Sequence, residues 1–408
     1  MSIEEKALEM HKKNQGKLRV ESKVPVKNDE DLALAYTPGV AEPCKKIHTN
    51  RDAIYDYTSK GNLVAVVSDG TAVLGLGDIG PEAAMPVMEG KAVLFKAFGG
   101  VDAFPVCLGT KDIDELVRTV QLLEPTFGGI NLEDIAAPAC FEIEKRLIQQ
   151  MNIPVFHDDQ HGTAIVVLAG LINALKIVKK SINEIRIAVN GAGAAAMAVT
   201  KLIMARGAQN VVMCDSKGII YEGRKEGMNP YKEEMARITN RKGYRGDLKE
   251  ALKDADVFIG LSRADTVTKQ MVKTMAPNPV VFAMANPVPE IMPDKAKEAG
   301  AAVIVTGRSD FPNQINNVLA FPGVFRGALD TRARLINEEM KIAAANAIAG
   351  LISEDEIRSD YIIPKPFDPR VAPKVAAAVA KAAVDTKVAR INVDTEEIER
   401  RTRKLALI

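Results

Sequence analysis

Apolar and polar positions follow two alternating patterns along the chain, and this alternation predicts the fold. From about Leu63 onward, short runs rich in β-branched residues alternate with longer runs of helical spacing, which is typical of a parallel sheet covered by helices. The predicted strands are residues 64–67, 103–108, 129–132, 154–156, 185–189, 211–214, 257–261, 280–284 and 302–305. We therefore predict an α/β protein in which two α/β domains are joined end to end.

The predicted domain boundaries lie where the pattern of apolar and polar residues changes. We expect a first domain at residues 1–160 and a second domain at residues 161–391, because a long apolar helix begins near His161 and leads to a glycine-rich turn. The second domain should contain a doubly wound parallel sheet of the Rossmann type. Few strand patterns occur before residue 60, and the tail at 392–408 is rich in charge, so both ends should form peripheral helices.

Composition narrows the class of protein. At 408 residues, the chain is longer than a single hydrophobic core usually accommodates, and with 47% hydrophobic residues it has ample apolar surface to bury. The 54 basic residues nearly cancel the 53 acidic ones, which disfavours nucleic acid and membranes as partners and favours a small-molecule substrate. The most apolar run, residues 163–178, is interrupted by Gly170, Asn173 and Lys176, so we predict a buried helix there.

Two further features indicate a cytoplasmic protein. Residues 1–13 mix Glu, Lys and His and lack the apolar centre of a secretory signal. The four cysteines lie far apart without metal-binding or disulfide spacing, so we expect reduced thiols at Cys44, Cys107, Cys140 and Cys214.

A glycine-rich turn predicts a dinucleotide site. The motif Gly191-x-Gly193-x-x-Ala196 follows one predicted strand and opens a helical run, and the next predicted strand ends at Asp215. Glycines permit close approach to a pyrophosphate, the helix N-terminus attracts its charge, and the acid accepts hydrogen bonds from a ribose. The residues assigned to this site are Gly191, Ala192, Gly193, Ala194, Ala195 and Asp215.

Two points about this site stay open at the sequence level. A second motif, Gly75-x-Gly77-x-x-Gly80, has no acid after the next strand, so we interpret it as a structural or substrate-site loop. Asp215 should repel a 2′-phosphate, whereas neighbouring Lys and Arg residues would attract one. The cofactor is therefore NAD or NADP.

Acidic pairs follow two of the predicted strands. Glu133 and Asp134 come after one strand, and Asp158 and Asp159 come after another. Neighbouring strand ends lie about 5 Å apart, and carboxylates prefer hard cations, so Glu133, Asp134 and Asp159 are expected to bind Mg²⁺ or Mn²⁺. The alternatives are simple helix capping and a zinc pair at His157 and His161, which lacks further ligands nearby in sequence.

Two residues are candidates for acid–base chemistry. Tyr36 lies in a Tyr-Thr-Pro-Gly turn that would hold its phenol as a proton donor. Lys91 precedes an apolar helix face, where desolvation would lower its pKa and produce a general base. The alternatives are a half-buried packing role for Tyr36 and a solvated position for Lys91.

Several segments resemble the malic enzyme family, particularly its short bacterial branch. They occur in family order, at residues 36–41, 89–91, 132–134, 156–164, 191–196, 285–287 and 314–323. The resemblance implies that residues 1–160 bind (S)-malate and a metal ion, and that residues 161–391 bind NAD or NADP. It also implies a homodimer.

The resemblance assigns roles to individual residues. It implies that Tyr36 is the general acid, Lys91 the base and Asp158 the acid beside that base. Asn286 and Asn317 match residues that contact the substrate, and Asn286 also lies near the cofactor site. One departure is that Asp69-Gly-Thr-Ala72 lacks the substrate-binding arginine of longer relatives, so the group that binds the C1 carboxylate of malate is undefined.

The implied reaction is the oxidative decarboxylation of malate to pyruvate and CO2, through oxaloacetate and enolpyruvate held on the metal. Two other functions remain possible on sequence alone. A metal-independent amino-acid dehydrogenase would also combine a lysine with a nucleotide domain. A non-catalytic nucleotide-binding regulator would use none of the acid–base residues.

Overall fold

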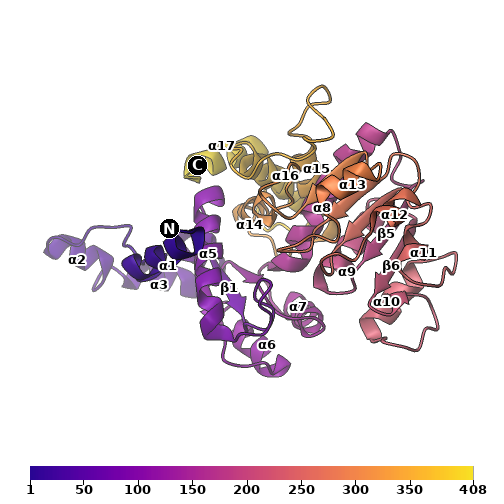
Figure 1. Cartoon of the computed structure of the whole chain (residues 1–408). Coiled ribbons are helices and arrows are strands. Elements are labelled where there is room, and N and C mark those ends of the chain that lie inside the picture. The colour runs from indigo at the N-terminus through magenta and orange to yellow at the C-terminus, as the bar shows by residue number, and fades with distance from the viewer. Residues whose placement is uncertain (408) are drawn as a thin grey trace.

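The computed structural model describes residues 1–407, which fold around two separate β-sheets (Figure 1). The first sheet is parallel, with strand order β2-β1-β3-β4. Its strands are β1 (Leu63–Ser68), β2 (Asp102–Cys107), β3 (Gly129–Leu132) and β4 (Val155–His157). Three longer helices lie between them in sequence: α5 (Pro81–Gly99), α6 (Ile113–Leu122) and α7 (Ala139–Gln150).

The carboxyl ends of β3 and β4 meet at one edge of this sheet. The register pairs Leu132 with His157, so the next residues along the chain, Glu133 and Asp158, are neighbours. The backbone N–H of Glu133 also donates to the carbonyl of Val67 at the end of β1, at 2.9 Å. Acidic side chains from separate segments therefore gather at one place.

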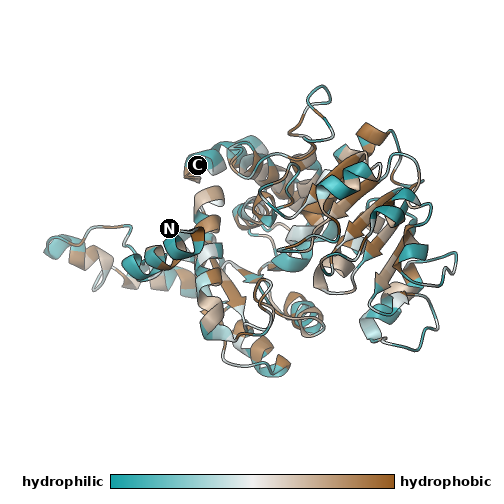
Figure 2. Cartoon of the chain, in the orientation of Figure 1, coloured by the Kyte–Doolittle hydropathy of each residue, from teal (hydrophilic) through white to brown (hydrophobic). Residues whose placement is uncertain are grey.

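The second sheet has strand order β10-β9-β8-β5-β6-β7 and is parallel except for the β6–β7 pair. Its strands are β5 (Arg186–Asn190), β6 (Asn210–Asp215), β7 (Gly218–Ile219), β8 (Val257–Gly260), β9 (Val280–Ala283) and β10 (Val303–Thr306). The strands are apolar along their length (Figure 2), as expected for a sheet covered on both faces. The order runs outward from β5 in both directions, so its carboxyl end is the switch point where ligands bind in such sheets.

Five helices lie between the strands of the second sheet in sequence. They are α9 (Ala194–Ala205), α10 (Pro230–Ile238), α11 (Leu248–Leu252), α12 (Lys269–Lys273) and α13 (Pro293–Glu298).

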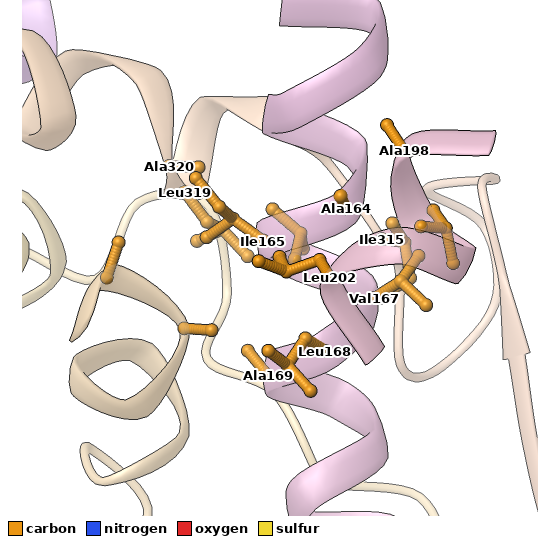
Figure 3. Close-up of a cluster of buried hydrophobic side chains, with 14 of the residues drawn as sticks. Ala164, Ile165, Val167, Leu168, Ala169, Ala198, Leu202, Ile315, Leu319 and Ala320 are labelled. Carbon is orange, nitrogen blue, oxygen red and sulfur yellow. The ribbon is translucent and has the colours of Figure 1, made fainter. Parts of the chain in front are cut away.

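Helix α8 (Asp158–Val178) connects the two sheets and begins directly after β4. It is long and apolar enough to cross a membrane, but most of it is buried inside the protein. Figure 3 shows its side chains Ile165 and Leu168 close to Leu202 of α9 and Leu319. The predicted buried helix is therefore confirmed, although it begins five residues earlier than predicted.

The C-terminal helices join the two halves of the molecule. They are η3 (Asn317–Leu319), α14 (Phe321–Asp330), α15 (Glu338–Ala349), α16 (Val371–Asp385) and α17 (Thr395–Leu405). The rings of Phe321 and Phe325 on α14 pack edge-on against Phe95 of α5. Helix α14 thus covers a helix of the first sheet, although the chain reaches it only after completing the second sheet (Figure 1).

The N-terminal region is peripheral, as predicted. It comprises α1 (Ile3–Asn14), α2 (Asp29–Ala35), α3 (Ala41–Thr49), η1 (Arg51–Ala53), α4 (Ile54–Tyr57) and η2 (Ser59–Asn62). Helices α1, α2 and α3 contain no buried residue within the described chain. Figure 1 shows α2 standing away from both sheets.

The predicted strands are all present, each within one residue of its expected bounds. The two-residue strand β7 was not predicted, because two residues are too few to show the alternation of apolar and polar residues that indicates a strand. The charged tail forms α17, which packs against α16. All four cysteines are free, as expected, and burial, the largest cause, raises the pKa of both Cys140 and Cys214 to about 12.

Candidate active site

Three carboxylates converge at the edge of the first sheet. One oxygen from each of Glu133, Asp134 and Asp159 lies within 4.8 Å of the others. Asp134 has a left-handed backbone (φ 54°), and its N–H donates to Oδ2 of Asp159 at 2.9 Å. Within residues 1–407, the buried Oδ2 of Asp134 has no hydrogen-bond partner. This set of oxygen ligands fits a divalent cation such as Mg²⁺ or Mn²⁺.

The electrostatics of the three carboxylates also favour a cation. Burial and then the negative charge of Asp159 raise the pKa of Asp134 from 3.8 to about 7. Burial likewise raises the pKa of Glu133 well above its usual value, even though Lys91 acts in the opposite direction. Burial is the largest cause of both shifts, and a bound divalent cation would offset the buried negative charge.

Lys91 lies beside this cluster. Its Nζ is 2.8 Å from Oε1 of Glu133 and 2.6 Å from Oδ2 of Asp158, and its side chain is only 10% exposed. The ring of Phe321 on α14 covers the ammonium group, 4.3 Å from Nζ to the ring centroid. The alternative of a solvated position is therefore excluded, because the lysine is buried among carboxylates.

The pKa of Lys91 departs from the sequence-based expectation. Burial lowers it, as expected, but the charges of Asp158 and Glu133 and their hydrogen bonds outweigh that effect and raise it above the usual value. The expectation considered desolvation alone and omitted two carboxylates that only the fold brings to the lysine. Without a cation, Lys91 is held as an ammonium ion.

Asp158 is fully buried between Lys91 and Asn317. Burial raises its pKa, while the charge and hydrogen bond of Lys91 oppose that effect. The side-chain amide of Asn317 donates to Oδ2 of Asp158 at 3.2 Å, which brings this predicted substrate residue to the same site. Gly162 was missed at the sequence level, yet a Cβ there would lie 1.9 Å from Oδ1 of Asp158. A glycine one helical turn after a buried acid is the signal that would have identified it.

The glycine-rich turn lies at the carboxyl end of β5, as predicted. Gly191 has φ +137°, and a Cβ there would lie 2.5 Å from the carbonyl oxygen of Leu261, so only glycine fits. A Cβ on Gly193 would meet nothing within 4 Å, which leaves room for a ligand beside the backbone. A cavity of about 480 Å³ opens here, lined in part by Gly191, Ala192, Gly193 and Asp215. Ala194 and Ala195 form the first turn of α9.

Asp215 also lines this cavity, but its carboxylate is already paired. Arg224 donates to both of its oxygens, and Nζ of Lys232 lies 2.7 Å from Oδ2. Although burial raises its pKa, the hydrogen bonds from Arg224 and Lys232 hold the pKa of Asp215 at about 2. The negative charge expected to repel a 2′-phosphate is therefore offset by two cations.

Two predicted site residues, Asn286 and Tyr36, lie outside the carboxylate cluster. Asn286 follows β9, and a Cβ on Gly75 would be 3.9 Å from its carbonyl oxygen, so the Gly75 loop of the first half reaches Asn286. This loop does not line the cavity at Gly191. Tyr36 caps the end of α2 and is 67% exposed. Within the described chain it makes no hydrogen bond to Lys91 or to the carboxylates.

A buried ionic cluster behind the carboxylates was not predicted. Glu144 on α7 contacts Nε2 of His161, and Nδ1 of His161 lies 3.0 Å from Nζ of Lys341. Burial raises the pKa of Glu144, but the charge and hydrogen bond of His161 and the charge of Lys341 outweigh this and lower the pKa to about 2. Burial, the largest cause, lowers the pKa of His161, so its ring bridges Glu144 and Lys341. The histidines do not join the metal-type cluster among residues 1–407.

Comparison with known proteins identifies relatives along the whole chain. The family model "Malic enzyme, N-terminal domain" matches residues 15–148, and "Malic enzyme, NAD binding domain" matches residues 160–384. The chain is 66% identical to the bifunctional malic/malolactic enzyme of Bacillus subtilis, with all of both chains covered. It is 57% identical to the NAD-dependent malic enzyme of Geobacillus stearothermophilus, covering 92% of this chain and 78% of that protein.

A solved malic enzyme structure has a closely similar fold. The malic enzyme from Pyrococcus horikoshii superimposes with a TM-score of 0.96 at 51% identity, covering 99% of this chain and 96% of that chain. Other relatives of about 50% identity include NADP-dependent as well as NAD-dependent enzymes.

Proposed function

The chain belongs to the malic enzyme family, and on that premise we propose how its residues divide the work of the reaction. The activity is the oxidative decarboxylation of (S)-malate by NAD(P)⁺ to pyruvate, CO2 and NAD(P)H. The observation that carries our assignment is the position of Lys91, whose Nζ contacts both Asp158 and Glu133. Proton transfer and metal binding would therefore act on one and the same substrate group.

Glu133, Asp134 and Asp159 would hold Mg²⁺ or Mn²⁺. Such a cation supplies Lewis-acid assistance at the C2 oxygen of the substrate and offsets the negative charge of the carboxylates. The unpartnered Oδ2 of Asp134 and the raised pKa values of Asp134 and Glu133 support this ligand set.

Lys91 is the proposed base for the oxidation step. Once the negative charge around it is offset, burial favours its neutral amine, which takes the proton of the C2 hydroxyl as hydride leaves C2 for the nicotinamide. Asp158 holds the amine in position through the 2.6 Å contact. Asn317 orients both Asp158 and the substrate, and Asn286 contacts substrate and cofactor from the end of β9.

Tyr36 is the proposed acid for the second half of the reaction. After the C4 carboxylate departs as CO2, its phenol gives a proton to C3 and recovers one from the Lys91 ammonium. The proton taken from the hydroxyl is thereby returned, so the sum of the steps consumes no external proton.

The turn at Gly191–Gly193 and the first residues of α9 would bind the dinucleotide pyrophosphate. The paired state of Asp215 supports use of NADP as well as NAD, because Arg224 and Lys232 counter its charge. The domain limits of 1–160 and 161–391 and cytoplasmic, homodimeric assembly belong to the same proposal.

The test is an assay with malate and Mn²⁺ in which the metal is then removed with EDTA. We expect NAD(P)H formation to require malate and to stop when EDTA is added. Metal-independent oxidation of an amino acid would instead support an amino-acid dehydrogenase. Dinucleotide binding without any turnover would support a regulator.

A second candidate activity is conversion of malate to lactate and CO2. It is favoured by the 66% identity to the malic/malolactic enzyme over the full length. In this case the NADH formed in the first step reduces pyruvate before it leaves. Lactate production with only a trace of NAD would support this activity, and pyruvate as the sole product would exclude it.

A further inference from the structure

A cavity of about 620 Å³ lies between the two halves of the molecule and shares no lining residue with the cavity at Gly191. It is lined by α7 of the first half, by the connecting helix α8, and by α9, α10 and α15. Figure 1 shows α7 facing α9. None of the residues that the proposed reaction uses lines this cavity. Cavities of this size between domains commonly bind small molecules.

Many of the side chains that line the cavity are apolar. Met197, Ala198 and Leu202 of α9 are buried there. The ring of Phe141 on α7 packs against that of Tyr231 on α10, with ring centroids 4.7 Å apart, so aromatic side chains from both halves meet at the cavity. An apolar or aromatic ligand fits such a lining.

The buried polar groups of the cavity have a free donor but no free acceptor. Oε1 of Glu144 accepts from the N–H of His157 at 3.0 Å, Oε2 accepts from the amide of Gln160 at 3.2 Å, and Nε2 of His161 contacts both oxygens. Within residues 1–407, Nζ of Lys341 makes one hydrogen bond, to Nδ1 of His161 at 3.0 Å. An ammonium group has three N–H donors, so two remain for a ligand.

Lys341 is also short of negative charge. Burial, the largest cause, lowers its pKa, although the charges of Glu144 and Glu338 oppose that effect. Glu234, another acid of the cavity, is exposed and already paired with Lys201 at 2.6 Å. An anion would supply the missing charge. A carboxylate matches the single ammonium group, whereas a phosphate would leave most of its oxygens without a donor.

We propose that this cavity is a second ligand site, which binds a carboxylate with an apolar or aromatic body through Lys341, and that its occupant strengthens metal binding. The link to the metal runs through the first turn of α8, which carries Asp158 and Asp159. Glu144 holds this turn by accepting from His157 and Gln160, and the same carboxylate is joined to Lys341 through His161.

The sign of the coupling follows from charge. An anion beside Lys341 adds negative charge behind the metal-type carboxylates, so it should raise the affinity for Mn²⁺, and Mn²⁺ should raise the affinity for the anion by the same factor. The coupling rests on the proposed function, in which Glu133, Asp134 and Asp159 hold the cation. The binding of the carboxylate does not.

Fluorine NMR on the full chain tests the site, with para-trifluoromethylbenzoate as the probe and the neutral para-trifluoromethylbenzamide as its match. We expect saturable binding of the benzoate, and binding weaker by about tenfold or more for the amide and for Lys341→Met. Lys297→Met, at a lysine that lines a different cavity, should bind the benzoate as wild type does. No saturable binding to wild type, or equal binding to Lys341→Met, would overturn the site.

A second variant blocks the cavity without removing a charge. Ile148 lines the cavity and is half-buried, so Ile148→Trp should fill part of the space and weaken benzoate binding while malate-dependent NAD(P)H formation stays near normal. Unchanged benzoate binding in this variant would contradict the proposal. Displacement of the probe by malate, without a dinucleotide present, would place the probe in the substrate site and contradict it as well.

Calorimetry tests the coupling. Mn²⁺ is titrated into the protein with and without saturating para-trifluoromethylbenzoate, and we expect the dissociation constant to fall at least about twofold with the probe. An unchanged or higher constant would overturn the coupling. Absence of any Mn²⁺ binding would contradict the proposed function and the coupling together, whereas the fluorine signals would still decide whether the cavity binds a carboxylate.

Discussion

The ammonium nitrogen of Lys91 lies 2.6 Å from Oδ2 of Asp158, although the two residues are 67 positions apart in the sequence. The same nitrogen contacts Glu133, one of the three carboxylates that converge on a possible cation. Because Asp158 and Asp159 occupy the first turn of α8, that single turn supplies both the partner of the proposed base and a proposed metal ligand. Four predictions test the proposed roles of the lysine, the carboxylates, the buried cluster at Glu144 and the nucleotide turn.

Removal of the lysine should abolish the oxidation step. Lys91→Ala is expected to lower the initial rate of malate-dependent NAD(P)H formation by a factor of about 10² to 10⁴, because the variant lacks the proposed base. Lys96→Ala, on the same helix but half exposed, is the control and should keep its rate. A near-normal rate in a folded Lys91→Ala protein would require another base.

Removal of one carboxylate should weaken the metal more than the cofactor. Asp159→Asn is expected to reduce Mn²⁺ affinity in calorimetry at least about tenfold, which is the smallest loss typical even of outer-shell changes. Dinucleotide affinity should stay close to normal, since the Gly191 cavity lies in the other half of the molecule. Asp114→Asn, at an exposed carboxylate, provides the comparison. Equal Mn²⁺ affinity in both variants would exclude Asp159 as a ligand.

The buried cluster at Glu144 should contribute to acid stability. Its pKa falls from 4.5 to about 2 on folding, so the stabilisation is fully present above pH 4.5 and is lost as pH falls towards 2. Glu144→Gln should therefore be less stable at neutral pH, by about 3 to 5 kcal/mol, because the buried Lys341 loses its counter-charge.

Denaturant unfolding at several pH values measures this effect. The difference between wild type and Glu144→Gln should shrink as the pH is lowered from 4.5. Glu142→Gln, at a less buried position of the same helix, should show a much smaller difference. A Glu144→Gln deficit that does not depend on pH would assign the effect to packing alone.

Two glycines of the nucleotide turn should respond differently to the same substitution. Gly191→Ala should lower the melting temperature as well as dinucleotide affinity, because its Cβ would collide with Leu261 in a strained backbone, at a cost of about 1 to 3 kcal/mol. Gly193→Ala has open space and should reduce only dinucleotide affinity. If both variants bind the dinucleotide normally, the cofactor lies elsewhere.

The strands, the carboxylate cluster and the nucleotide turn could be predicted from the sequence, because each depends on residues that are close together along the chain. Strands appear as short β-branched runs, and acids directly after two of them must lie at a strand end. The glycine turn is likewise recognisable from its strand-turn-helix context. These features gave the strand bounds, the carboxylate set and the nucleotide turn.

The remaining features depend on contacts between distant segments. The pKa of Lys91 is raised by two carboxylates that approach it only in the folded chain, so desolvation alone gave the wrong direction. Glu144, His161 and Lys341 come from three helices, and no spacing marks them as partners. The outward position of Tyr36 could not be predicted either, since its motif indicates chemistry and not the direction in which α2 projects.

In the proposed reaction, one site oxidises malate and then removes its C4 carboxylate. Its most direct test is to incubate the protein with malate, Mn²⁺ and either NAD or NADP, and to quantify NAD(P)H and pyruvate in the same sample. We expect equal molar amounts of NAD(P)H and pyruvate with at least one dinucleotide. NAD(P)H without pyruvate, or no reaction with either dinucleotide, would contradict it.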